Sequence, residues 1–282
     1  MKKILSVILA IALVFLFCAC GGSSKAKGIT IAIPNDTTNE ARALLLLESL
    51  GYIKLKDGAG ITATVLDIAE NPYNITFNEV EAAQLANVRK DVDFAVINCN
   101  YALEAGLNPA ADALALEGSA SAYVNILCVK EGHENDPLVK ALSAALLSQK
   151  VADFITDTYA GSVISVVENP TDGYDPSIDY AALSGSEISV AASVTPHAEV
   201  LAVAKEILAE KDISLKIVEF TDYVQPNNVV ESGEIDANYF QHVPYLQDFN
   251  AENGTHIVSV AGIHVEPLGI YAGKQASLDS IK

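Results

Sequence analysis

Ile29-Thr-Ile-Ala-Ile33 runs directly into Pro34-Asn-Asp-Thr-Thr-Asn-Glu-Ala-Arg-Ala-Leu-Leu-Leu-Leu47. The first stretch is short, apolar and β-branched, which predicts a buried strand. Asp36, Thr37 and Asn39 then offer capping oxygens to a helix from about residue 39 to 50, and Gly51 can take the left-handed position at its end. A strand that leads into a helix is the unit from which α/β folds are built.

Short apolar runs alternate with helical patterns along the rest of the chain, so we expect α/β architecture throughout. The predicted strands are residues 29–33, 63–68, 93–97, 123–129, 188–192, 215–220, 256–261 and 268–272. Apolar residues at helical spacing predict further helices around residues 138–146 and 200–208. Residues 168–186 are rich in Pro, Gly, Asp and Ser and lack periodicity, which indicates a linker or surface loop.

The length leaves room for two domains of roughly 100 to 150 residues. We place one α/β lobe at residues 29–117, with the tail 275–282 returning to it, and a second lobe at residues 118–274. Two lobes joined by a few crossing segments predict a cleft in which hinge closure can enclose a small ligand.

The N-terminus predicts export. Lys2 and Lys3 precede an apolar run from Ile4 to Phe17, and small residues follow, as in a secretory signal spanning residues 1–19. The run is short for a membrane-spanning helix. Ala19-Cys20 resembles the lipobox of bacterial lipoproteins, which implies that Cys20 is acylated and that residues 20–28 tether the protein to the outer side of a membrane. A soluble secreted protein is the alternative.

Composition excludes one class of partner. Removal of the signal leaves 15 basic against 36 acidic residues and a formal charge of −21. Nucleic acid binding needs clustered Lys and Arg, so nucleic acid is not expected as a partner. Only Cys99 and Cys128 remain after the lipobox, and whether they pair is open.

The sequence gives little support for an enzymatic function. The sequence contains no phosphate loop, no dinucleotide fingerprint, no nucleophile elbow and no zinc-protease motif. The five His residues show no metal-ligand spacing along the sequence. We therefore expect no catalytic residues, no metal and no cofactor.

Two segments concentrate aromatic and amide side chains. They are Asp222-Tyr-Val-Gln-Pro-Asn227 and Asp236-Ala-Asn-Tyr-Phe-Gln-His-Val-Pro-Tyr-Leu246, which we expect to form adjacent loops. Core packing would explain some of these rings. However, a thioether pairs well with ring edges, so a cluster of this density suits a methionine side chain.

Polar groups suited to an amino-acid head group lie elsewhere. Arg42 stands in the first turns of the predicted helix, where a guanidinium can pair with a carboxylate. Asn98 ends an apolar strand and Asn125 lies inside another, and buried amides must find partners. A surface Arg and two structural Asn residues are the alternative reading.

These motifs together resemble the methionine-binding lipoproteins of ABC importers, the NlpA type. The carrying residues are Asn-Asp-x-Thr-Asn-x-x-Arg at 35–42, Val-Ile-Asn at 96–98, Tyr-Val-Asn at 123–125 and the two aromatic segments. The resemblance implies a two-lobed, type II periplasmic-binding-protein-like fold with the ligand between the lobes. It further implies a head-group site of Arg42, Asn98 and Asn125 and a side-chain pocket of Tyr223, Phe240, His242 and Tyr245.

The order of the segments differs from that family. The aromatic segments precede the Arg42 segment there and follow it here, so we interpret the chain as a circular permutation with a new junction at residues 162–185. The implied function is capture of L-methionine for delivery to an ABC transporter permease. The alternatives are a methionine-containing dipeptide or another apolar amino acid as ligand, or a surface adhesin or scaffold on this fold.

Overall fold

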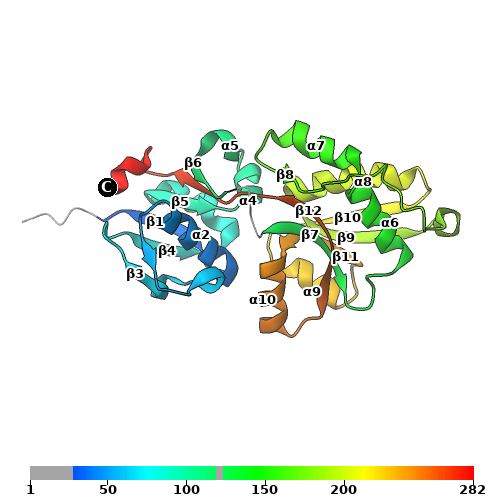
Figure 1. Ribbon diagram of the computed structural model, residues 1–282, viewed down its shortest axis with the longest axis horizontal. Coiled ribbons are helices and arrows are strands. Elements are labelled where there is room, and N and C mark those ends of the chain that lie inside the picture. The colour runs from blue at the N-terminus through cyan, green and yellow to red at the C-terminus, as the bar shows by residue number, and fades with distance from the viewer. Residues whose placement is uncertain (1–27, 119–122) are drawn as a thin grey trace, which may run out of the picture.

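The computed structural model describes residues 28–118 and 123–282, and two β-sheets organise them (Figure 1). The predicted signal, the Cys20 lipidation site and nearly all of the tether lie outside these residues. Within the described part of the chain, no helix combines the length and apolar character needed to cross a membrane. Both described cysteines, Cys99 and Cys128, are free and buried.

The first sheet has five strands in the order β4-β1-β5-β13-β6. Their bounds are β1 Thr30–Pro34, β4 Thr76–Val80, β5 Phe94–Ile97, β6 Ala113–Leu116 and β13 Gly269–Ala272. β1 is parallel to both β4 and β5, whereas β13 is antiparallel to β5 and β6. Because β13 belongs to this sheet, the predicted boundary of the second lobe at residue 274 is wrong, and the chain re-enters the first lobe before Gly269.

Helices cover both faces of the first sheet. α2 (Thr37–Ser49) packs Leu44 and Leu47 on the face that carries Ile31 and Ile33. α3 (Leu85–Val88) and α4 (Cys99–Glu104) lie against the other face, and α5 (Pro109–Asp112) precedes β6. α2 begins at Thr37, two residues before the predicted start, and Asp36 is the one of the three candidate caps that is used, since it accepts a hydrogen bond from the Asn39 backbone N–H at 3.0 Å.

One predicted strand in this lobe is wrong. Residues 65–67 form a 3₁₀ turn, and only Ile68–Glu70 (β3) is extended, paired with β2 (Lys54–Leu55). The turn forms because the Asp67 carboxylate accepts hydrogen bonds from the backbone N–H and the hydroxyl of Thr64, both at 3.1 Å. Such local side-chain bonds compete with sheet pairing.

The second sheet has six strands in the order β10-β9-β11-β7-β12-β8. Their bounds are β7 Val124–Lys130, β8 Ile164–Ser165, β9 Glu187–Ser193, β10 Ser214–Phe220, β11 Ala237–His242 and β12 Ile257–Val265. β10, β9 and β11 are parallel, and β7 is antiparallel to its neighbours β11 and β12. Four of these strands overlap predicted ones, namely β7, β9, β10 and β12. β8, which lies within the predicted junction at residues 162–185, and β11 were not predicted as strands.

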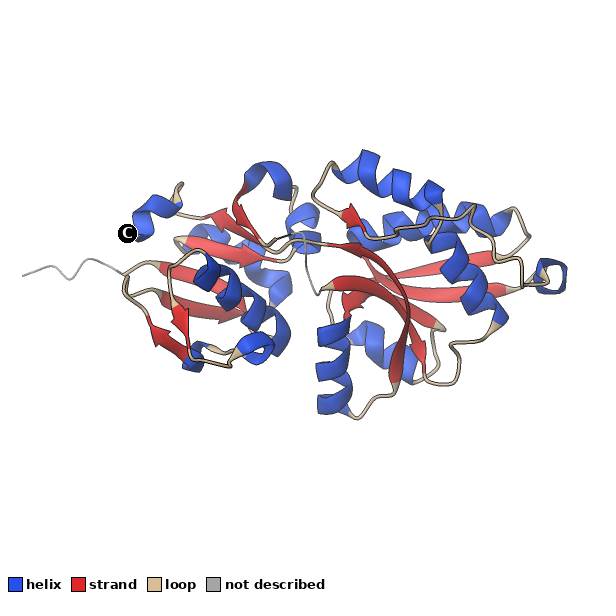
Figure 2. Cartoon of the chain, viewed as in Figure 1, coloured by secondary structure: helices blue, strands red, loops and turns tan. Residues whose placement is uncertain are grey.

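Helices also cover both faces of this sheet (Figure 2). α6 (Pro137–Leu146), α7 (Gln149–Tyr159) and α8 (Glu199–Ala209) share a core with Leu127 and Val129. α9 (Gln225–Glu231) and α10 (Val243–Asn253) pack on the opposite face. The predicted linker 168–186 holds only the short turn Tyr180–Leu183.

The predicted pair of adjacent loops is half wrong. Residues 221–224 are a loop, but residues 225–227 begin α9, and Ala237–His242 is a fully buried strand between β9 and β7. A strand buried on both faces shows no alternation of apolar and polar residues, which is why its period was not visible. Pro244 stands in the first turn of α10, where proline is favoured, and does not break the segment.

The chain passes between the two sheets twice, from β6 to β7 and from β12 to β13. Figure 1 shows the second crossing running between the lobes. The C-terminal turn Leu278–Ile281 returns to the first lobe as predicted, since Ile281 is buried in the cluster that contains Ile31 and borders Ile29.

Candidate functional site

A cavity lies where the two lobes meet. It contains about 350 Å³ of space outside the protein atoms, counting its opening to solvent. The lining residues are Asn39, Arg42, Asn98, Cys99, Asn100, Asn125, Tyr223, Phe240, Gln241, His242, Tyr245 and Glu266.

All seven residues that the sequence singles out for a ligand line this cavity. Arg42 and Asn98 come from the first lobe, and the other five come from the second. Arg42 stands on α2, Asn98 ends β5, and Asn125 lies on β7. The structure therefore brings these side chains together; their binding of a ligand stays a prediction.

Arg42 is the only cationic side chain among the lining residues, and it is 4% exposed. Its Nη2 and Nε donate to the Glu117 carboxylate at 2.6 and 3.3 Å, and Nη2 also donates to the Glu266 backbone carbonyl at 3.1 Å. The guanidinium lies 4.2 Å from the centre of the Tyr123 ring. Glu117 and Glu266 stand on the two crossing segments, so Arg42 ties α2 to both.

Asparagine side chains continue this polar wall. Asn39 Oδ1 accepts hydrogen bonds from Arg42 Nη1 at 3.2 Å and from Asn98 Nδ2 at 2.9 Å. Asn98 Oδ1 is buried and has no hydrogen-bond partner among the described residues. An acceptor of this kind suits a ligand donor such as an ammonium group.

The opposite side of the cavity is aromatic. The rings of Tyr223, Phe240 and Tyr245 lie 5.9 to 6.1 Å apart between centroids. The Tyr223 hydroxyl donates to Asn100 Oδ1 at 2.6 Å, which links the second lobe to the first. The Tyr245 hydroxyl donates to the Tyr223 carbonyl at 2.9 Å. These hydrogen bonds hold the rings at a spacing that suits an apolar or thioether side chain.

His242 connects the polar and aromatic sides. Its Nε2 lies 3.3 Å from Arg42 Nη1, and its Nδ1 lies 3.3 Å from the Tyr245 backbone N–H. Burial, and then the Arg42 charge, lower the pKa of His242 well below its usual value. The imidazole is therefore neutral at physiological pH.

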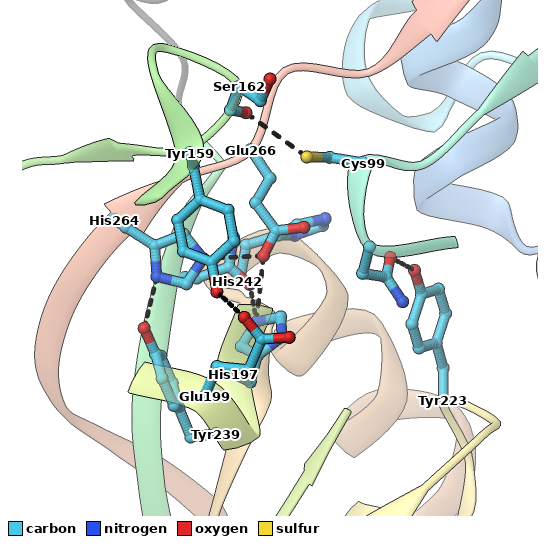
Figure 3. Close-up of polar contacts among 12 residues, drawn as sticks. Cys99, Tyr159, Ser162, His197, Glu199, Tyr223, Tyr239, His242, His264 and Glu266 are labelled. Atoms are coloured by element: carbon cyan, nitrogen blue, oxygen red, sulfur yellow. Dashed lines mark hydrogen bonds and ion pairs between the residues drawn. The ribbon is translucent and has the colours of Figure 1, made fainter. Parts of the chain in front are cut away.

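A second polar cluster runs from Glu266, which lines the cavity, to histidines of the second lobe (Figure 3). Glu266 Oε1 is 2.7 Å from His264 Nε2 and 3.1 Å from His197 Nε2. His264 Nδ1 contacts the Tyr239 hydroxyl, and His197 Nε2 lies 2.9 Å from Asn125 Oδ1. Burial lowers the pKa of both imidazoles to about 3 and raises the pKa of Glu266.

His197, His264 and Glu266 form a group whose potential ligand atoms lie within 4.8 Å of one another. A metal would have to bind both Nε2 atoms, which would move the ring protons to Nδ1. His197 Nδ1 is buried with no partner among the described residues, so a proton there would have no acceptor. The donors and acceptors fit a hydrogen-bond network better than a metal centre.

Sequence reasoning missed Glu117, Glu266 and the histidines behind the cavity. Two glutamates among the 36 acidic residues of the chain give no signal. Their position at the ends of β6 and β12 becomes informative only once the strands are known to lead from one lobe to the other. His197, in the turn after β9, and His264, on β12, are 67 residues apart, and their rings lie 5.1 Å apart between centroids only in the folded chain.

A model of the NlpA lipoprotein family matches residues 23–167 and 188–282 of the chain. The membrane lipoprotein TpN32 of Treponema pallidum is 48% identical over 138 residues, which cover 49% of this chain and 52% of that protein. The D-methionine-binding lipoprotein MetQ of Escherichia coli K12 is 38% identical over 166 residues, which cover 56% and 61%. The chain thus spans little more than half the length of the curated relatives it matches.

Solved structures give similar partial matches. A nutrient binding protein from Burkholderia cenocepacia, solved bound to methionine, is 50% identical and covers 49% of this chain and 58% of that one, with a TM-score of 0.48. The lipoprotein Tp32 of Treponema pallidum is 49% identical, with a TM-score of 0.46 and coverage of 48% and 56%.

Proposed function

We propose that this chain, which belongs to the NlpA lipoprotein family, is a solute-binding protein. It captures methionine between its lobes and delivers it to an ABC importer. The names of the MetQ relatives support methionine as the ligand. On this proposal the chain is a binding protein and not an enzyme.

One observation carries the proposal: a single cavity joins a buried guanidinium on one side to three aromatic rings on the other. An amino acid has the same polarity along its length, with a charged head group and, in methionine, a thioether at the far end.

Each part of the site has a role in this binding mode. Arg42 would pair with the α-carboxylate, and Asn98 Oδ1 would accept a hydrogen bond from the α-ammonium group. Tyr223, Phe240, His242 and Tyr245 would enclose the side chain. Because the lining residues come from both lobes, binding would hold the lobes together and release would require them to part.

Anchoring follows the same proposal. We expect cleavage before Cys20, acylation of that cysteine, and attachment of the mature protein to the outer side of the cell membrane. Two lipid chains or more would hold it stably. Mass spectrometry of the membrane fraction, with Cys20→Ser as the unmodified control, tests this expectation.

The ligand is tested by calorimetric titration of the purified mature protein after unfolding and refolding to remove co-purified solutes. We expect L-methionine to bind with a dissociation constant in the micromolar range or tighter, equivalent to about 8 kcal/mol or more. D-Methionine, leucine and a methionine-containing dipeptide complete the panel. If the dipeptide or leucine binds more tightly than methionine, that compound becomes the proposed ligand. If none of the compounds gives a binding heat, the alternative of a surface scaffold is favoured.

A further inference from the structure

Asn125 faces His197 with its oxygen and the cavity with its nitrogen. The Oδ1 atom lies 2.9 Å from His197 Nε2. Asn125 lines the cavity and is 5% exposed, and none of the hydrogen bonds among the described residues uses its Nδ2. The nitrogen is therefore a donor available to a ligand.

The orientation of this amide depends on which nitrogen of His197 carries the proton. Nε2 also lies 3.1 Å from Glu266 Oε1, and a carboxylate oxygen needs a donor. A lone pair on Nε2 would face this oxygen and Asn125 Oδ1 at once, so Nε2 carries the proton; it donates to Asn125 Oδ1 and lies within ion-pair distance of Glu266. A donor at this position fixes Asn125 Oδ1 toward His197 and leaves Nδ2 toward the cavity.

The rest of the network holds His197 in this state. His264 Nε2 donates to the same Glu266 oxygen at 2.7 Å, and the Tyr239 hydroxyl donates to His264 Nδ1. All four side chains are at most 8% exposed, and they come from β11, β12, the crossing segment and the turn after β9. Asn125 on β7 pairs in register with His264 on β12, so the sheet itself brings the network to the amide.

We propose that His197 is a positioning residue that acts through Asn125. As the Nε2–H tautomer, anchored by Glu266, it presents Asn125 Nδ2 as a donor to the carboxylate of the ligand. This inference rests on the proposed function for the identity of the ligand, but the tautomer and the amide orientation belong to the protein alone.

The first test uses binding. The variants are His197→Met, which removes the donor, and His197→Gln, which keeps an N–H near the position of Nε2. We expect His197→Met to weaken L-methionine binding about tenfold, the effect of one lost hydrogen bond of about 1.4 kcal/mol. L-Methioninol, which keeps the amine but lacks the carboxylate, should lose much less. His197→Gln should restore most of the affinity for methionine.

A double-mutant cycle separates positioning from general damage to the fold. In an Asn125→Ala background, His197→Met should cause no further loss of methionine binding, because the group it orients is absent. The exposed His256, paired with Glu231, supplies a matched control as His256→Gln. Additive effects, or equal losses for methionine and methioninol, would reduce His197 to a structural residue and overturn the proposal.

The second test does not depend on methionine. Nitrogen-15 NMR of the histidine rings at pH 7 should report His197 and His264 as neutral Nε2–H tautomers. An Nδ1–H tautomer or an imidazolium at His197 would overturn the proposal even if methionine binds. If the wild type binds no methionine while the tautomers are as expected, the proposed function fails and the assigned orientation stands.

Discussion

At the scale of single residues, Arg42 carries the sharpest prediction. Arg42→Ala should weaken methionine binding by roughly 2 to 5 kcal/mol, because it removes one partner of a buried charge pair. Arg89→Ala is the control: Arg89 lies outside the cavity and donates to the Ala272 carbonyl at 2.9 Å. Calorimetry on both variants measures the difference, and small, equal losses would contradict a role for Arg42 in binding.

Arg42→Ala also affects Glu117, so its effect on binding has two sources. Without the guanidinium, the Glu117 carboxylate loses both of its hydrogen bonds from Arg42. Part of any loss could then come from the unpaired acid. Arg42→Ala combined with Glu117→Gln removes that contribution, and the double variant should still bind methionine poorly.

The candidate site could be predicted residue by residue only where a motif marked it. Arg42 stands out because the chain has two arginines, and the aromatic residues stand out by their density. Asn100 and Gln241 also line the cavity, yet nothing in their neighbours distinguishes them from other amides. Contacts such as that of Asn100 with Tyr223 join residues 123 positions apart and arise only from the packing of the two lobes.

At the scale of elements, three buried amides fix the aromatic wall. Asn227 Nδ2 donates to Gln241 Oε1 at 2.9 Å, and Asn227 Oδ1 accepts from Asn238 Nδ2 at 2.9 Å and from Gln241 Nε2 at 2.7 Å. This cluster attaches α9, which follows the Tyr223 loop, to β11, which carries Phe240. The two aromatic segments therefore keep a constant separation.

Asn227→Leu should break this attachment. We expect a loss of about 1 to 3 kcal/mol in the free energy of unfolding, because the buried Gln241 Oε1 loses the donor Asn227 Nδ2, and Gln241 Nε2 and Asn238 Nδ2 each lose one acceptor. Methionine binding should weaken more than alanine binding, since the change displaces the side-chain pocket and leaves the head-group site intact. Urea denaturation and calorimetry measure the two effects.

The exposed Asn228 is the neighbouring position for a control. Asn228→Leu should leave both measurements near wild type, since this side chain is exposed and makes none of the three-amide contacts. Equal effects of Asn227→Leu and Asn228→Leu on unfolding and on methionine binding would contradict the proposed role of the three amides in holding the aromatic segments.

Element prediction succeeded where periodicity or caps were visible and failed where burial was uniform. α2 could be predicted from its cap at Asp36, and β1, β5 and β7 from short apolar runs. β11 escaped prediction because its amides and aromatic rings are all buried between two neighbouring strands. Polar residues in a central strand give the pattern of a loop unless their partners are known.

At the scale of the whole molecule, the buried histidines make stability depend on pH. The pKa of His197 is about 3 in the folded protein and about 6.5 when exposed, so the unfolded state binds more protons between these values. The contribution of neutral His197 to stability is complete above pH 6.5 and is lost as the pH falls toward 3. Glu266, whose pKa burial raises, acts in the opposite direction.

Comparison with a variant isolates the histidine. The unfolding free energy of the wild type should fall more steeply than that of His197→Gln as the pH drops from 7 to 4, by at most about 1.4 kcal/mol per pH unit. Chemical denaturation at several pH values measures both slopes. Parallel slopes would mean that His197 does not titrate in this range on unfolding.

The permuted order stays a prediction that the topology supports. Ile29 at the start of the first lobe and Ile281 at the end of the chain meet in one hydrophobic cluster. The family model matches on either side of residues 168–187, within or beside the proposed junction. A chain reordered as residues 186–282, a short linker, then residues 28–167 should fold and bind methionine with similar affinity. Failure of this chain to fold would contradict the proposed junction.

The contact between Arg42 and Glu117 has a consequence for ionic strength. The guanidinium is already balanced by a carboxylate, so a zwitterionic amino acid enters without changing the net charge of the enclosed space. The affinity for methionine should then vary little between low and high salt, because salt mainly screens long-range attraction between exposed charges, and such attraction contributes little to this binding. The same balance would disfavour singly charged analogues, so the site selects a dipole rather than an ion. A mature protein of formal charge −21 can then collect a neutral nutrient without electrostatic attraction.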